Sequence, residues 1–286
     1  MQEIPLEHPI DLAATLNSGQ AFHWTPEGRG FAGTVGPNAA YVEQRDPLTV
    51  GIDSSSVDAV CRYLALDHDL ARIFSAFPKR DKPLRLAMDF APGLRILRQP
   101  HWECLATFIT SSLKQVAHIR QISLRLRETF GTPVDSVGST RLHAYPTPEA
   151  LANAGEKALR DCGLGYRAAF LHRTATAIRD GALDLRAVAT LDDVAARKAL
   201  CQLYGVGEKI ADCVLLFAYE RHASFPVDVW IERVLRQLYF GGAPEITPRA
   251  IREFARSHFG PYGGYAQQFL FHYARVTGLK ESGRLR

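Results

Sequence analysis

Lys209 and Asp228 are the residues whose types and spacing could do covalent chemistry together. Lys209 follows the glycine turn of LYGVGEKIADC (203–213), and Asp228 follows Phe-Pro-Val just before another apolar helical run. The positive end of a helix dipole favours the neutral form of an amine, and a neutral amine is a nucleophile that can form a Schiff base. Asp228 also fits an N-cap. Either residue alone is better explained as a surface lysine or an ordinary cap. The pair at this spacing favours a catalytic amine and carboxylate.

The glycine turn itself is a second feature with chemical meaning. Gly205 and Gly207 flank Val206 and permit a tight turn with positive φ. Such a turn exposes backbone N–H groups at the start of the next helix, where a phosphate oxygen binds well. The alternative is an ordinary corner between two helices that binds nothing. The flanking apolar residues, Lys209 and Asp228 favour a phosphate-binding helix–hairpin–helix.

The elements that must position these residues follow from periodicity. Residues 19 to about 53 contain short β-prone segments separated by glycines, whereas nearly everything after about residue 100 has helical spacing of apolar residues. We therefore predict a small α+β domain over residues 1–95 and a helical domain over residues 96–286, with the hairpin at about 203–213.

Composition and motifs narrow the class of protein. The chain has 286 residues, a formal net charge of +4 and 47% hydrophobic residues, which suits a globular protein and is compatible with a nucleic-acid partner. It has no apolar run of about 18 residues and no signal-peptide pattern, so we expect an intracellular protein without a membrane segment. Five cysteines without a C-x2-C pair, and no HExxH motif, predict a reducing environment and no metal site.

On these motifs the sequence resembles the helix–hairpin–helix DNA glycosylase superfamily, and within it the 8-oxoguanine DNA glycosylase family. The resemblance covers nearly the whole chain and implies an α+β fold in which a small antiparallel sheet domain packs on a mainly α-helical domain. The segments that carry it occur in the family's order: SGQAFHW (18–24), LRILRQPHWECLATFITSS (94–112), GLGYRAAFL (163–171), LYGVGEKIADC (203–213), FPVDV (225–229) and FGPYGGYAQQFLF (259–271).

The resemblance implies a bifunctional glycosylase and AP lyase of base excision repair. Lys209 would attack C1′ of the damaged nucleoside and expel the base, and the resulting imine would allow β-elimination of the 3′ phosphate. Asp228 would stabilise the positive sugar and assist proton transfers, its position as a cap keeping it ionised. The damaged base must leave the DNA stack to reach both residues.

The resemblance also implies a base pocket. Gly19 would offer its carbonyl to the N7–H of 8-oxoguanine, Gln267 would read the Watson–Crick edge, and Phe271 and Cys213 would sandwich the ring. Taken singly, these residues are better explained as a turn glycine, a solvated amide and helical core. Only their joint match supports a pocket.

DNA-binding residues are implied in the same way. The backbone of Gly205, Val206 and Gly207 would bind phosphate, Tyr166 would insert beside the vacated stack, and Arg167 would reach the opposite base. Trp230 stands where the family usually has histidine, so it would either stack near the DNA or pack in the core.

One segment departs from the family pattern. Leu113, Lys114 and Gln115 replace an asparagine run that fills the gap left by the flipped base, and His118 replaces an arginine that reads the opposite cytosine. We therefore expect weaker discrimination of the opposite base, since Lys and neutral His are poor substitutes for a planar fork of donors.

Cofactors, partners and rival functions complete the prediction. We expect no required cofactor, a candidate monovalent-cation site at the hairpin carbonyls, damaged double-stranded DNA as partner, and a monomer. An alkylpurine DNA glycosylase of the same fold is one alternative, although that branch usually lacks the hairpin lysine. A non-catalytic helix–hairpin–helix DNA-binding module is another, although it needs no pair like Lys209 and Asp228.

Overall fold

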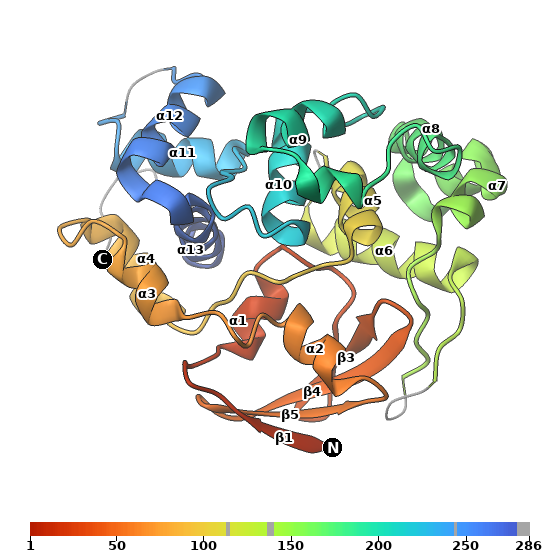
Figure 1. Cartoon of the computed structure of the whole chain (residues 1–286), viewed down its shortest axis with the longest axis horizontal. Coiled ribbons are helices and arrows are strands. Elements are labelled where there is room, and N and C mark those ends of the chain that lie inside the picture. Colours follow the sequence, from red (N-terminus) through yellow and green to blue (C-terminus); the bar gives the residue numbers. More distant parts are fainter. Residues whose placement is uncertain (113–114, 136–139, 243–244, 279–286) are drawn as a thin grey trace.

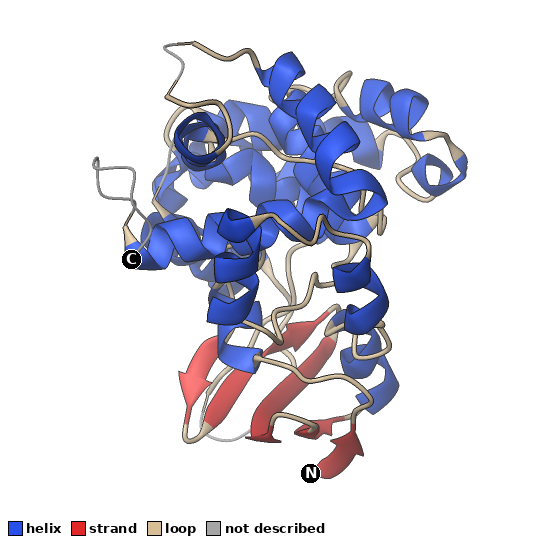
Figure 2. Cartoon of the chain, turned by 90° about the vertical axis from the view of Figure 1, so that its left-hand side faces the viewer, coloured by secondary structure: helices blue, strands red, loops and turns tan. Residues whose placement is uncertain are grey.

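The computed structural model describes residues 1–112, 115–135, 140–242 and 245–278. An antiparallel sheet lies at one end of the molecule, and helices make up most of the rest (Figures 1 and 2). The prediction of an α+β fold, with a small N-terminal antiparallel sheet packed on a mainly helical domain, is confirmed.

Strands and helices alternate only near the N-terminus, and after the last strand the elements of the described chain are all helices. The strands are β1 (Gln2–Pro5), β2 (Thr25–Glu27), β3 (Gly30–Val35), β4 (Asn38–Asp46) and β5 (Thr49–Ser54). The helices are α1 (Leu12–Asn17), α2 (Val57–Tyr63), α3 (Leu70–Ser75), α4 (Lys82–Phe90), α5 (His101–Ser111), α6 (Val116–Phe130), α7 (Pro148–Leu159), α8 (Arg167–Arg179), α9 (Asp193–Leu200), α10 (Glu208–Ala218), α11 (Val229–Leu238), α12 (Pro248–Phe259) and α13 (Gly263–Thr277). Short π and 3-10 segments cover Arg160–Leu164, Ala187–Thr190 and Gly260–Tyr262.

The sheet has the strand order β1-β5-β4-β3-β2, with antiparallel pairing throughout. Gly36, at φ +58, lies in the short turn between β3 and β4, a backbone conformation that favours glycine. Val42, Val50 and Ile52 are fully buried in a core that the sheet shares with α1 and α2. One face of the sheet is therefore covered by short helices from the same part of the chain.

The helical part is built around α5 and α10, which are buried on almost every side. Every residue of α10 from Ile210 to Ala218 is buried, and all of them are apolar except Asp212, which pairs with Arg197. The rings of Phe108 on α5 and Phe217 on α10 stack with centroids 5.5 Å apart. The position of α10, and hence of Lys209 in its first turn, is fixed by close packing.

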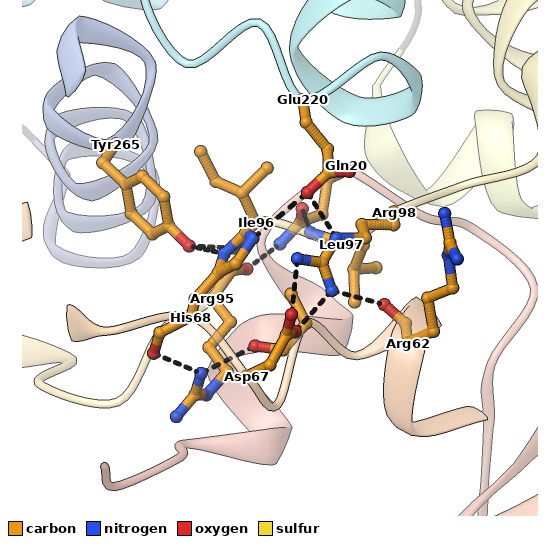
Figure 3. A network of polar contacts seen from close by, with 11 residues as sticks. Gln20, Arg62, Asp67, His68, Arg95, Ile96, Leu97, Arg98, Glu220 and Tyr265 are labelled. Carbon is orange, nitrogen blue, oxygen red and sulfur yellow. Dashed lines mark hydrogen bonds and ion pairs between the residues drawn. The ribbon is translucent and has the colours of Figure 1, made fainter. Parts of the chain in front are cut away.

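Gln20 ties the loop before β2 to the segment between α4 and α5 (Figure 3). Its Nε2 donates to the carbonyl of Arg95 at 2.7 Å, and its Oε1 accepts from the N–H of Leu97 at 2.9 Å. Gln99 returns a bond, Nε2 to the carbonyl of Gln20, at 2.7 Å. These bonds are buried, so they hold the neighbouring Gly19 against the helical part.

Packing does not divide the chain at residue 95. Leu70 and Ile73 on α3, and Leu84 and Ala87 on α4, are buried in the larger helical core and not in the core of the sheet. The linear order of strands followed by helices could not show this. Among the described helices, none combines the length and the apolar character that crossing a membrane would require.

Candidate active site

The hairpin turn places Lys209 at the start of α10. Gly205 has φ +81, and a Cβ there would lie 2.6 Å from the side chain of Phe170, so both conformation and space require glycine. The positive φ that the two glycines permit is found at Gly205 and not at Gly207, which has φ −95 and forms the N-cap without a side-chain bond. A Cβ on Gly207 would meet nothing within 4 Å. Conformation and packing therefore require glycine at position 205, and neither requires it at position 207.

Lys209 lies on the wall of a cavity. Its Nζ is 5.6 Å from the ring centroid of Phe108, and no carboxylate of the described residues lies within ion-pair distance of it. Its immediate surroundings are thus an aromatic face and the cavity, which leave the amine accessible for reaction.

Asp228 is the N-cap of α11. Its Oδ1 accepts from the N–H of Trp230 at 3.1 Å and of Ile231 at 2.9 Å. Burial raises the pKa of this carboxyl, and the two backbone bonds and the charge of Lys209 oppose that rise. The sequence argument anticipated the cap and not the burial, which works against ionisation. The two cap bonds fix the carboxyl group in position, and the charge of Lys209 acts on its pKa.

The cavity has a volume of about 770 Å³ and lies between the N-terminal loop, α5, α6, α10, α11 and α13. It brings together both predicted catalytic residues and all the predicted base-contact residues. Its predicted wall residues are Gly19, Gln115, Lys209, Cys213, Asp228, Trp230, Gln267 and Phe271.

The predicted base-contact residues differ in what they offer. A Cβ on Gly19 would lie 3.1 Å from the ring of Phe271, and φ is +84, so a side chain has no place there. Gln267 is 5% exposed, and its Oε1 is buried without a hydrogen-bond partner. Burial raises the pKa of the Cys213 thiol to about 12, so that side chain is a neutral, apolar wall. The cavity thus combines apolar surfaces with one unsatisfied acceptor.

Gln267 differs from its neighbour Gln268 in its hydrogen bonding. The amide of Gln268 donates to the carbonyl of Ser18 at 3.0 Å and helps to hold the N-terminal loop. A buried acceptor without a partner, as on Gln267, is uncommon in folded proteins and costs free energy. A ligand with N–H groups would satisfy it.

Two other predicted DNA contacts line no part of the cavity. Tyr166 is 47% exposed, in keeping with a residue free to contact DNA. Arg167 is buried, and its Nε donates to the carbonyl of Ser112 at 2.7 Å while its guanidinium lies 4.3 Å from the centroid of the Tyr166 ring. In this conformation Arg167 holds the end of α5 and does not extend outward.

Of the residues in 113–118 expected to lie near the opposite base, the structure describes Gln115 and His118. Gln115 is exposed, caps α6 and lines the cavity, while His118 is exposed and does not line it. Leu113 and Lys114 lie outside the described residues. Trp230 is half-buried on the cavity wall, with the guanidinium of Arg233 5.6 Å from its ring centroid.

Arg275 is a wall residue that the sequence analysis missed. It follows Gln267 and Phe271 at spacings of eight and four on α13, so helical periodicity places all three on one face. Its guanidinium lies 6.0 Å from the Phe271 ring centroid and bonds to the carbonyl of Asn17. The interval of four that separates Gln267 from Phe271, repeated once more, predicts Arg275 on the same face.

Comparison with known proteins places this site in a family. Residues 3–105 match the 8-oxoguanine DNA glycosylase N-terminal domain, and residues 106–259 match the HhH-GPD superfamily of base excision DNA repair proteins. The chain is 30% identical to an N-glycosylase/DNA lyase OGG1 of Arabidopsis thaliana, over 92% of this chain and 76% of that protein. It is 32% identical to a probable N-glycosylase/DNA lyase of Methanothermobacter thermautotrophicus, over 70% and 69% of the two chains.

Solved structures give the same result. An 8-oxoguanine glycosylase/lyase of Clostridium acetobutylicum, in complex with double-stranded DNA containing cytosine opposite 8-oxoguanine, superposes with a TM-score of 0.88. It is 29% identical, and the match covers 98% of this chain and 99% of that one. The chain belongs to the HhH-GPD superfamily of base excision DNA repair proteins, in the N-glycosylase/DNA lyase branch that carries the 8-oxoguanine DNA glycosylase N-terminal domain.

Proposed function

We propose that this protein is a bifunctional DNA glycosylase and AP lyase that excises 8-oxoguanine from duplex DNA. The observation that carries the proposal is one cavity that holds an accessible amine, Lys209, a capped carboxylate, Asp228, and an unsatisfied amide oxygen on Gln267. The DNA-bound 8-oxoguanine glycosylase/lyase of Clostridium acetobutylicum supports the substrate class.

Base release requires the neutral amine and the ionised carboxylate together. The Lys209 nitrogen forms a bond to C1′ of the flipped nucleotide as the bond from C1′ to the base breaks. The base leaves with the bonding electrons and takes up a proton, and the new secondary amine loses one. Positive charge develops on the sugar in the transition state, and the carboxylate of Asp228 stabilises it electrostatically.

Strand cleavage follows from the same covalent bond. Opening of the sugar converts the amine adduct to an imine at C1′, which makes the protons on C2′ acidic. Loss of one such proton expels the 3′ phosphate by β-elimination. Hydrolysis of the imine then frees Lys209.

Recognition uses a difference of one proton. 8-Oxoguanine carries an N7–H that can donate to the carbonyl of Gly19, whereas guanine has a lone pair there and would be repelled. The Watson–Crick edge of the base presents N–H donors, which suit the bare Oε1 of Gln267. Phe271 and the neutral thiol of Cys213 would pack on the two faces of the ring.

DNA binding uses the backbone and the exposed residues around the cavity. The hairpin from Gly205 to Gly207 offers N–H groups to a phosphate, and its carbonyls are a candidate site for a monovalent cation. Tyr166 and Trp230 are proposed to stack near the flipped nucleotide, and Arg167 to read the opposite base. In the free protein Arg167 holds the carbonyl of Ser112, so reading would require that bond to open.

Borohydride trapping on a duplex with 8-oxoguanine opposite cytosine tests the proposal. The wild-type protein should form a reduced covalent complex with DNA, and Lys209→Gln should bind the duplex but lose trapping, excision and cleavage. Lys198→Gln, at an exposed lysine of α9, is the matched control and should trap normally. Trapping by Lys209→Gln at the wild-type level would refute the assignment of the nucleophile. Release of methylated purines without trapping would identify the alkylpurine alternative.

A further inference from the structure

A second group of potential ligand side chains lies at the end of α10 that is far from Lys209. Figure 3 shows two of its members, His68 and Glu220. His68 comes from the turn before α3, and Glu220 and His222 follow α10. One ligand atom from each of the three lies within 4.8 Å of the other two. Two imidazoles and a carboxylate are a recurrent donor set for zinc.

His68 is held in an orientation that suits a ligand. Its Nδ1 is 2.5 Å from the hydroxyl of Tyr265, which also accepts from the N–H of Ile96 at 3.4 Å. When Nδ1 donates to that hydroxyl, Nε2 presents its lone pair towards Glu220, with 3.5 Å between Nε2 and Oε1. Ligating histidines are commonly fixed by a bond from their other ring nitrogen, and here Tyr265 provides it.

His222 is the least satisfied member of the group. Its Nε2 is buried without a hydrogen-bond partner, which is uncommon for a polar atom. Its ring meets that of His68 edge to face, with centroids 5.1 Å apart. A cation between the two rings would supply the missing partner.

The carboxylate of Glu220 is shared with Arg98, which pairs with both Glu220 and Asp67. A metal ion at this group would bind beside that ion pair.

Glu220 supplies both an entry path and a strained backbone. Its side chain is 41% exposed, so an ion can reach the group from solvent. Its φ is +55, a conformation usually left to glycine or asparagine after a helix. The chain adopts it with a carboxylate that points at His68 and Arg98.

We propose that His68, Glu220 and His222 bind a divalent transition metal ion, with Zn²⁺ the best fit and water as the fourth ligand. Ligands at about 2.0–2.1 Å from a tetrahedral ion lie roughly 3.3–3.5 Å apart, close to the separation of His68 and Glu220. The ion would join the turn before α3 to the end of α10. The proposal does not depend on the proposed function. It departs from the sequence-based expectation of no metal.

Metal titration of the whole chain tests the proposal. After chelator treatment, the protein is titrated with ZnCl₂ against a chromophoric competitor, and each variant is checked for folding by circular dichroism. We expect one Zn²⁺ per chain, at least tenfold weaker binding in His68→Gln and in His222→Gln, and about 10- to 100-fold weaker binding in Tyr265→Phe. His258→Gln is the control, because His258 pairs with a carboxylate elsewhere, Asp81. This variant should bind zinc as the wild type does. Unchanged affinity in both of the other histidine variants would overturn the proposal, as would absence of binding by the wild type.

A measurement on the wild type alone covers the case in which variants fail to fold. Co²⁺ in a site of two imidazoles and a carboxylate should give visible d–d bands without a thiolate charge-transfer band. A strong thiolate band would assign the metal to cysteines and overturn the proposal. Zinc should also raise the thermal midpoint of the wild type and not that of His222→Gln. Because Lys209 is remote from the group along α10, the metal-free protein should still be trapped on DNA by borohydride.

Discussion

Replacing Asp228 by asparagine separates its two roles, capping and catalysis. Both cap bonds, at 3.1 and 2.9 Å, end on Oδ1, and the amide oxygen of asparagine can accept both. Asparagine and aspartate are about equally good caps. Loss of the favourable interaction with the helix dipole costs about 0.3–1 kcal/mol, whereas removing a buried charge works in the opposite direction. The free energy of unfolding should therefore change by less than about 1 kcal/mol.

The chemistry should respond very differently. The amide carries no charge, so the electrostatic stabilisation of the developing positive sugar is lost. One such contact is worth about 2.7–4 kcal/mol in other enzymes, so single-turnover excision of 8-oxoguanine should fall by roughly 10²- to 10³-fold. Urea denaturation of the same preparation gives the stability, and the two measurements together separate the roles.

The pH profile gives a second readout with a defined sign. Burial raises the pKa of Asp228 above 3.8, so folding favours the protonated carboxyl. The stability that this group contributes is present below the unfolded pKa and is lost as the pH rises through the folded pKa. Activity runs the other way, because excision needs the ionised form. The wild-type excision rate should fall as the pH drops through a midpoint above 3.8, and Asp228→Asn should lack that limb.

Asp192 offers the matched control for capping. It caps α9, and its Oδ1 accepts from the N–H of Val194 at 2.9 Å and of Ala195 at 2.8 Å, but it is exposed and lines no part of the cavity. Asp192→Asn should match Asp228→Asn in stability and keep full excision. Near-wild-type excision by Asp228→Asn would refute the reasoning and leave that residue as a cap alone.

Two further predictions concern recognition and stability. Gln267→Ala should slow excision of 8-oxoguanine and leave affinity for an abasic-site duplex unchanged, as measured by single-turnover kinetics and DNA titration; equal loss on both DNAs would make Gln267 structural. Glu103→Gln should lower the free energy of unfolding by about 3–5 kcal/mol in denaturant titration, because it leaves the buried guanidinium of Arg127 without its anion. A loss below about 1 kcal/mol would show that Arg127 finds enough partners in Thr34 and His143.

Local sequence signals account for the parts of the site that could be predicted. A glycine turn before an apolar helix and a Pro-Val-Asp before another helix are short-range patterns, so Lys209 and Asp228 could be placed at helix starts from sequence. Gln267 and Phe271 share a face of one helix by spacing alone. The resemblance to a family, rather than any property of the residues, brought Gly19 to the same pocket.

Long-range contacts account for what could not be predicted. Arg167 looked free because nothing near it in sequence shows that it donates to Ser112. The unfavourable burial of Asp228 depends on how other helices enclose it. The group of His68, Glu220 and His222 joins segments far apart in the chain, and no spacing rule connects them.

The buried bonds of Gln20 have a consequence for building chimeras. The carbonyl of Gly19 is part of the proposed pocket, yet its place depends on Gln20, which bonds to Arg95 and Leu97 across the join with the helical part. α3 and α4, which come before that join in sequence, are already in the helical core. An N-terminal segment grafted from a relative at residue 95 would therefore replace part of that core and one partner of the Gln20 hydrogen bonds. The graft would transfer specificity for a damaged base only if the chimera kept both Gln20 and the backbone groups to which it bonds.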